Sequence, residues 1–178
     1  MLSWFRTTAH TDIATQRYVD IVTAARNPIL FEKLKIPDTL DGRFEAILLH
    51  GWLVMRRLKQ IEAAKPISQR LFDILFQDMD QNLREMGASD VVVGDRVKAM
   101  AKAFYGRIAA YESGLEAGDS ALLQALARNV FAGNPPPESE LAVLADYLRR
   151  ADAALQGVQD RRMISADPLD WPAVAVPV

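Results

Sequence analysis

Residues 39–59 read TLDGRFEAILLHGWLVMRRLK, the most apolar stretch of helical period in the chain. Apolar side chains recur every three or four residues from Leu40 to Leu58, and other apolar residues lie on the remaining sides of the same helix. A helix that is apolar over most of its circumference belongs in the middle of a bundle. The stretch therefore predicts a central helix around which the rest of the chain packs.

The sequence on either side predicts further helices and no convincing strand. Asn27 followed by Pro28, then Gly87, then the prolines at 135–137 separate the apolar periods from one another. The three valines at 91–93 have no second strand with which to pair, so we expect a loop that leads into a helix. The expected helices span about 11–27, 28–34, 39–59, 66–86, 95–113, 120–130 and 138–156. The sequence thus predicts an all-α fold, a single-domain bundle of about six or seven helices.

The end of the chain lacks a helical period. Residues 157–178 contain three prolines, which disfavour a continuing helix. We therefore expect a helical domain over 1–156 and an extended or disordered, irregular tail over 157–178. This tail can dock on the domain through Trp171.

Composition excludes several classes of protein. A length of 178 residues suits one domain, and 21 basic against 23 acidic residues give a net charge of −2. A dedicated nucleic-acid-binding protein carries a basic excess instead, so we expect no nucleic acid. The chain has no cysteine and only two histidines, His10 and His50. Thiolate chemistry is therefore excluded, and we expect neither a metal nor a cofactor.

The sequence also bears on location. No apolar run approaches the ~20 residues that cross a bilayer. The first residues lack the apolar stretch of a signal peptide, although Leu2, Trp4 and Phe5 could touch a membrane surface. We expect a cytoplasmic protein that can associate peripherally with the inner membrane.

The central helix carries a polar stripe. Arg43, His50 and Arg57 follow one another at intervals of seven, close to two helical turns, so they share one side of the helix. This stripe must either reach solvent or meet acidic partners. A histidine in such a setting is usually a hydrogen-bonded structural group.

Acidic side chains mark the helix expected at 66–86. Asp78 lies at the edge of its apolar face, beside Asn82, and Asp80 points outward. We expect these carboxylates to be solvated or to form a salt bridge with Arg43 or Arg107.

The helix expected at 95–113 has a basic and aromatic edge. Four basic residues oppose the single acid Asp95 between positions 95 and 107. Their long stems can cover the bundle while the charges reach water, or they can form a docking strip for an acidic protein segment or anionic lipid. Gly106 costs this helix about 1 kcal/mol relative to alanine, which suggests close helix packing or the approach of a partner.

The residues alone leave two other functions open. A small hydrolase would use Asp78 or Asp80 with His50 as the base, and it would need these groups to converge in a pocket. A helical carrier of lipid or quinone would instead need a dry apolar cavity lined by Trp52.

Three segments carry a family resemblance. PDTLDGRFE at 37–45, LFDILFQDMDQNLREMG at 71–87 and VGDRVKAMAKAFYGRIAAY at 93–111 resemble, in the correct order, the signature segments of the ubiquinol–cytochrome c chaperone family. The resemblance covers about residues 14–150 and leaves out the tail after 157. Without a targeting extension, the chain looks like the short α-proteobacterial members.

The resemblance implies an all-helical assembly chaperone that is not an enzyme. Members of this family bind cytochrome b, newly made or partly assembled, and promote assembly of the cytochrome bc1 complex of the respiratory chain. We place the client site between the acidic edge and the basic strip described above. The candidate partner-binding residues are Arg43, Asp78, Asp80, Arg96, Lys98, Lys102, Phe104, Tyr105 and Arg107.

Overall fold

Helices form the whole framework of the computed structural model. It describes residues 2–85, 87 and 90–175, with side chains for 8–85, 87, 92–95 and 97–175. The elements are α1 (Leu2–Ala25), α2 (Pro28–Glu32), α3 (Leu40–Leu58), the 3-10 helix η1 (Glu62–Ala64), α4 (Lys65–Glu85), α5 (Asp90–Ala117), α6 (Asp119–Asn129), α7 (Glu138–Gln156) and α8 (Asp160–Met163). No strand occurs in the described part of the chain, which confirms the all-α prediction.

The predicted central helix is α3. Most of its residues are buried, and it packs against α1, α4 and α7. Its start is set by Thr39, whose hydroxyl accepts a hydrogen bond from the amide of Gly42 at 3.1 Å. A side chain at Gly42 would clash with the carbonyl of Pro37, so only glycine allows the chain to turn into α3 this closely.

Two helices begin earlier than predicted. α1 starts at Leu2 instead of near residue 11, and α5 starts at Asp90 instead of residue 95. The valines at 91–93 therefore lie within α5, and the expectation of a loop there is wrong. The side chain of Val93 is fully buried, so its packing outweighs the weak helix propensity of a β-branched residue.

The end of α5 also differs from the prediction. We expected this helix to end at about residue 113, but it continues to Ala117 and includes Gly114, where a Cβ atom would stand 2.9 Å from the Cα of Leu122. Gly114 thus lets α6 pack closely on α5. The helix ends before Gly118, whose φ of +103° favours glycine. A Cβ atom at Gly106 would meet no atom within 4 Å, so close packing within the described part of the chain does not explain this glycine.

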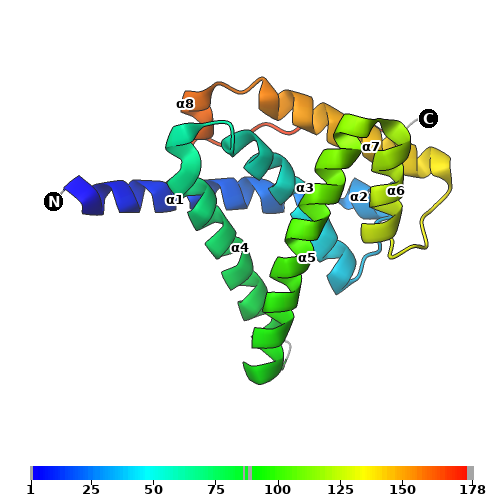
Figure 1. Cartoon of the computed structure of the whole chain (residues 1–178), viewed down its shortest axis with the longest axis horizontal. Helices are drawn as coiled ribbons and strands as arrows, with labels where there is room; N and C mark the ends of the chain where they lie inside the picture. The colour runs from blue at the N-terminus through cyan, green and yellow to red at the C-terminus, as the bar shows by residue number, and fades with distance from the viewer. Residues whose placement is uncertain (1, 86, 88–89, 176–178) are drawn as a thin grey trace.

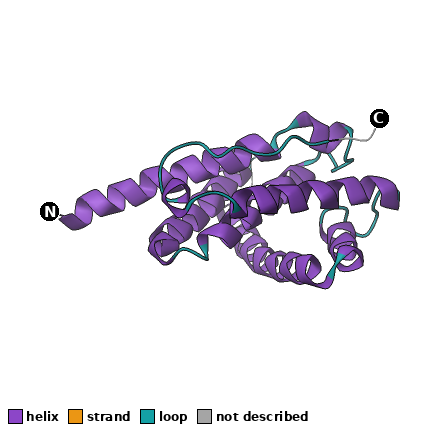
Figure 2. Cartoon of the chain, turned by 90° about the horizontal axis from the view of Figure 1, so that it is seen from above, coloured by secondary structure: helices purple, strands orange, loops and turns teal. Residues whose placement is uncertain are grey.

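The helices form a body from which one pair projects. α4 and α5 pack on each other and converge where α4 ends and α5 begins, far from α7 (Figure 1). The first turns of α1 extend beyond the other helices in both views (Figures 1 and 2). A small apolar cluster fills the space between α3, α4 and α5, separate from the main core. It comprises Phe44, Leu48, Leu75, Phe76, Met79 and Phe104.

The segment after Gly157 packs against the body. It contains α8 and continues without regular secondary structure to Ala175, the last described residue. Met163, Leu169 and Val174 are buried in the main core. Trp171 contacts His50 edge-on, with 5.0 Å between ring centroids, so the expected contact through Trp171 is present.

Candidate functional site

A cleft of about 520 Å³ opens between the end of α1, α2, the start of α3 and the end of α4. Its apolar lining includes Phe31, Leu40, Phe44, Ile47 and Met79. Its polar lining comprises Arg26, Glu32, Asp38, Arg43, Asp78 and Asn82. The cleft therefore combines an apolar surface with charges of both signs.

Local sequence signals build two walls of the cleft. Asn27 accepts a hydrogen bond from the amide of Ile29 at 3.1 Å and caps α2, and Pro28 occupies the first turn. This cap turns the chain after α1 and sets Phe31 at the cleft. The cap of α3 then presents Leu40, which keeps 47% of its surface exposed although it is a large apolar residue.

Two predicted residues line this cleft from different helices. Arg43 on α3 donates from Nε to Asp38 at 2.6 Å, and this hydrogen bond lowers the pKa of Asp38. Asp78 on α4 accepts a hydrogen bond from Asn82 Nδ2 at 2.8 Å. Burial raises the pKa of Tyr18 on α1, and a hydrogen bond to Asp78 raises it further. The structure thus places Arg43 and Asp78 in the lining of one cleft.

Two other predicted residues are engaged within the protein. Asp80 pairs with Arg84 one turn along α4, at 2.6 Å. Arg107 on α5 donates from Nε to Glu45 on α3 at 2.8 Å, and the two side chains make a second contact through Nη2. Burial raises the pKa of Glu45, while Arg107 acts to lower it. Arg107 therefore fastens α5 to α3.

The remaining predicted residues lie along α5. Phe104 is 1% exposed and belongs to the small cluster. Tyr105 is 61% exposed and stacks on Phe72, with ring centroids 5.6 Å apart. Lys98 and Lys102 are exposed. The side chain of Arg96 lies outside the described residues.

The polar stripe of α3 splits into different environments. Arg43 is exposed, whereas His50 is buried, with Nδ1 2.7 Å from the carbonyl of Ala46 and Nε2 2.9 Å from the hydroxyl of Tyr147. A carbonyl can only accept, so Nδ1 carries the proton and Nε2 accepts from the tyrosine. Burial lowers the pKa of His50 to about 4. His50 is thus a neutral structural group.

These contacts disagree with both alternative functions. Neither Asp78 nor Asp80 meets His50, so the acid and base groups of the hydrolase hypothesis do not converge. Trp52 is 1% exposed and donates from Nε1 to Glu112 at 2.9 Å. Trp52 is not part of the lining of the cleft, so this cleft is not the Trp52-lined cavity expected of a carrier.

Sequence reasoning missed the apolar part of the site and one ion pair. Phe31 and Leu40 were assigned to helices by their spacing, and nothing in that spacing shows that α2 folds back to form a cleft. Glu45 gave a usable signal, because an acid inside an apolar helix needs a cationic partner. The identity of that partner, Arg107, depends on how α5 crosses α3.

The sequence of the chain matches that of a known protein family. A family model described as "Ubiquinol-cytochrome C chaperone" matches residues 32–171. The match includes Trp171, so the expectation that the resemblance leaves out everything after 157 is wrong.

The chain is similar to curated proteins from several organisms and to a solved structure. It is 28% identical over 142 residues to "Ubiquinol-cytochrome-c reductase complex assembly factor 1" of Xenopus laevis, covering 79% of this chain and 71% of the frog protein. It is 28% identical over 121 residues to "Protein CBP3, mitochondrial" of Saccharomyces cerevisiae, covering 66% of this chain and 36% of the yeast protein. The crystal structure of the Cbp3 homolog from Brucella abortus superposes with a TM-score of 0.84 at 33% identity, covering 97% of each chain.

Proposed function

The chain belongs to the ubiquinol-cytochrome c chaperone family, whose members are assembly chaperones and not enzymes, and we propose that it binds cytochrome b during assembly of the bc1 complex. The cleft between α1, α2, α3 and α4 is the observation that carries this proposal. Cytochrome b is an apolar membrane protein, and its apolar segments must be shielded from water until they are assembled. An apolar groove with a charged rim suits such a segment, because apolar anchors supply affinity and rim charges supply orientation.

The lining of the cleft suggests how a client segment would be held. Leu40 and Phe31 offer apolar surface at the cleft, and Arg43 and Asp78 offer one charge of each sign. A helical client segment that buries apolar side chains against Leu40 could pair polar residues at its ends with these two charges. The client is thereby shielded without any chemical step.

The exposed edge of α5 is the second contact surface in this proposal. Lys98, Lys102 and Tyr105 are exposed on α5. The pair formed by α4 and α5 extends away from the body (Figure 1). This edge suits an acidic loop of the client or the anionic surface of the membrane. No helix in the described part of the chain is long and apolar enough to span a bilayer. In this proposal the protein meets its client at the cytoplasmic face of the membrane.

Site-specific photocrosslinking tests the proposal. A photoreactive residue replaces Leu40 in the cleft, and a matched variant carries it at Val19, which has nearly the same exposure (48%) but does not line the cleft. Both proteins are produced in cells that synthesise cytochrome b, and the crosslinked products are identified by mass spectrometry. We expect cytochrome b to be crosslinked from position 40 and far less from position 19.

Two outcomes count against the proposal. Equal crosslinking from both positions would remove the cleft as the client site. Recovery of other proteins but no cytochrome b, while cytochrome b is being made, would remove cytochrome b as the client.

A further inference from the structure

The last described segment packs on the body without backbone–backbone hydrogen bonds. Residues 166–175, here called the strap, follow α8 and have no regular secondary structure. None of these residues takes part in a backbone–backbone hydrogen bond in the described structure. Every hydrogen bond that holds the strap therefore involves a side chain of the strap or of the body.

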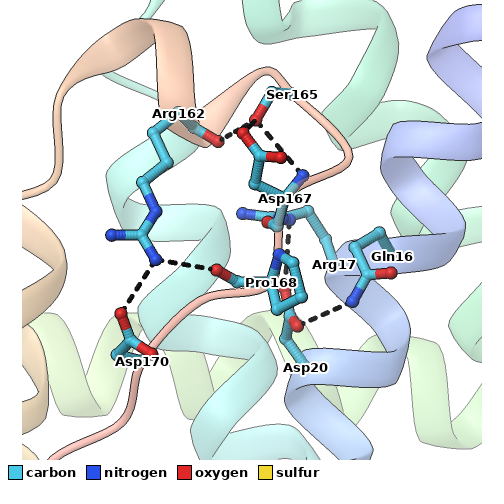
Figure 3. A network of polar contacts seen from close by, with 8 residues as sticks. All are labelled: Gln16, Arg17, Asp20, Arg162, Ser165, Asp167, Pro168 and Asp170. Carbon is cyan, nitrogen blue, oxygen red and sulfur yellow. Dashed lines mark hydrogen bonds and ion pairs between the residues drawn. The ribbon is translucent and has the colours of Figure 1, made fainter.

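Arginines from three helices hold the carbonyl groups of the strap. Arg17 on α1 donates from Nη2 to the carbonyl of Asp167, and Arg150 on α7 donates from Nη1 to the carbonyl of Ala173 at 2.8 Å. Arg162 on α8 donates from Nη2 to the carbonyl of Pro168 at 3.0 Å (Figure 3). Carbonyl groups are present in any polypeptide, so these bonds do not depend on the side chains of the strap.

Apolar side chains supply the rest of the contact. Leu169 and Val174 are each 7% exposed and belong to the main core. Trp171 lies edge-on against His50 of α3. The strap is thus an irregular chain with apolar anchors that lies against α1, α3 and α7, and the surface of these helices beneath it is here called the groove.

The groove leaves polar groups incompletely paired. Arg17 is fully buried, and its Nε and Nη1 have no hydrogen-bond partner within the described part of the protein, although Nε lies 3.2 Å from Asp20 Oδ2 in an ion pair. Burial lowers the pKa of Arg17, and Asp20 opposes this effect. Arg150 Nη2 and Trp171 Nε1 are likewise buried without a hydrogen bond to any described residue. Buried donors without acceptors cost free energy, so the docked strap is less favourable than its apolar burial suggests.

We propose that the strap is releasable and that the groove beneath it takes an extended acidic and apolar segment of a partner polypeptide in its place. The chemistry of this partner is inferred from the strap itself, which combines Asp167 and Asp170 with Leu169, Trp171 and Val174. The arginines on α1 and α7 stay in place to hold the carbonyl groups of the incoming chain. This groove does not share lining residues with the cleft proposed for the client, and the inference does not depend on that cleft.

Cysteine accessibility tests the proposal, because the chain contains no cysteine of its own. Val174→Cys places a thiol on the buried side of the docked strap, Ala175→Cys is the exposed control, and Leu144→Cys in α7 is a buried control that reports global unfolding. We expect Cys modification at 174 to be at least about tenfold faster than at 144, because a local opening needs less free energy than global unfolding. An excess of the peptide ISADPLDWPAVA, which is residues 164–175, should speed modification at 174 several-fold, and a scrambled peptide should not. Equal rates at 174 and 144, or no response to the peptide, would overturn the proposal.

A second measurement uses the unaltered protein. The chain has only two histidines, so the ring proton signals of His50 can be followed by NMR. A peptide of the strap sequence that carries Trp171→Leu would remove the indole ring from His50 when it displaces the strap, and the His50 signal should move. The same peptide with Leu169→Asp and Val174→Asp added should have no effect. An unchanged His50 signal at saturating peptide would contradict displacement.

Discussion

Arg107 on α5 donates a hydrogen bond from Nε to the buried carboxylate of Glu45 on α3, 2.8 Å from Glu45 Oε2. Glu45 lies within the most apolar helix of the chain, so its charge is tolerated there only because a guanidinium faces it. The pair ties the projecting helix pair to the body. It also explains why Arg107, although part of a basic strip, contributes to the architecture.

Removing the cation should therefore destabilise the fold. Arg107→Met leaves Glu45 without its partner and should lower the free energy of unfolding by about 2–3 kcal/mol at neutral pH, since Arg107 is partly exposed. Burial raises the pKa of Glu45, so its carboxylate takes up a proton more readily in the folded protein than in the unfolded chain. The loss should thus shrink as the pH falls through the raised pKa of Glu45, where its carboxylate is neutralised. Urea unfolding measures both quantities. Arg84→Met, which breaks the more exposed pair with Asp80, is the control and should cost less than about 1 kcal/mol. A loss equal to that of the control would contradict the buried role.

His50 should make the folded protein less stable as the pH falls. Its pKa is lowered from 6.5 to about 4 by burial, so below pH 6.5 the unfolded chain binds a proton that the folded protein does not. Stability is therefore fully present above 6.5, and about 3 kcal/mol of it should be lost as the pH falls to about 4. His50→Gln should show a shallower decline over this range, although it is less stable at neutral pH. Urea unfolding at a series of pH values gives the slopes, and identical slopes for the two proteins would refute the prediction.

Two glycines in α5 should respond oppositely to the same change. At Gly114 an added Cβ meets the backbone of Leu122, so Gly114→Ala should cost about 1–3 kcal/mol through overpacking between α5 and α6. At Gly106 no described atom lies within 4 Å, so Gly106→Ala should raise stability by up to about 1 kcal/mol through helix propensity. Thermal and urea unfolding of the two variants provide the comparison. The packing argument fails if both changes shift stability in the same direction.

Charge reversal on α5 tests the second client surface. Lys98→Glu with Lys102→Glu changes two exposed side chains, so the free energy of unfolding should stay within about 0.5 kcal/mol of the original. Recovery of cytochrome b with the tagged protein should fall several-fold. Lys59→Glu with Lys33→Glu makes the same change in net charge at exposed positions just after α3 and α2. If both double variants reduce recovery equally, net charge rather than the α5 edge is responsible.

Helix boundaries were predictable wherever the sequence carries its own stop or start signal. Asn27 with Pro28 and Gly87 act through local hydrogen bonds or backbone freedom, and the structure has breaks at both of them. The early start of α5 was not predictable, because it depends on the burial of Val93 in the folded protein. The continuation of α5 through Gly114 was not predictable either, because the glycine inside this helix is required by the close approach of α6.

The candidate site was only partly predictable. The sequence predicts Arg43 in the polar stripe of the central helix and Asp78 at the edge of an apolar face, and the structure places both in the lining of one cleft. Asp80 and Arg107 have the same residue types but do not line the cleft. Asp80 pairs with Arg84 one turn along the same helix, whereas the partner of Arg107 depends on which helices cross, and residue type and spacing do not show this.

The sequence by itself determined that the chain is all-helical, that residues 39–59 form its centre and that it resembles a family of assembly chaperones. These features follow from local propensity, from apolar period and from the order of motifs along the chain. Only the tertiary structure decided that α2 lines a cleft beside Leu40 and that Arg107 forms an ion pair with Glu45. It also decided that Trp171 of the strap packs against His50. Each of these joins residues far apart in sequence, and their meeting depends on the packing of whole helices, which no local pattern specifies.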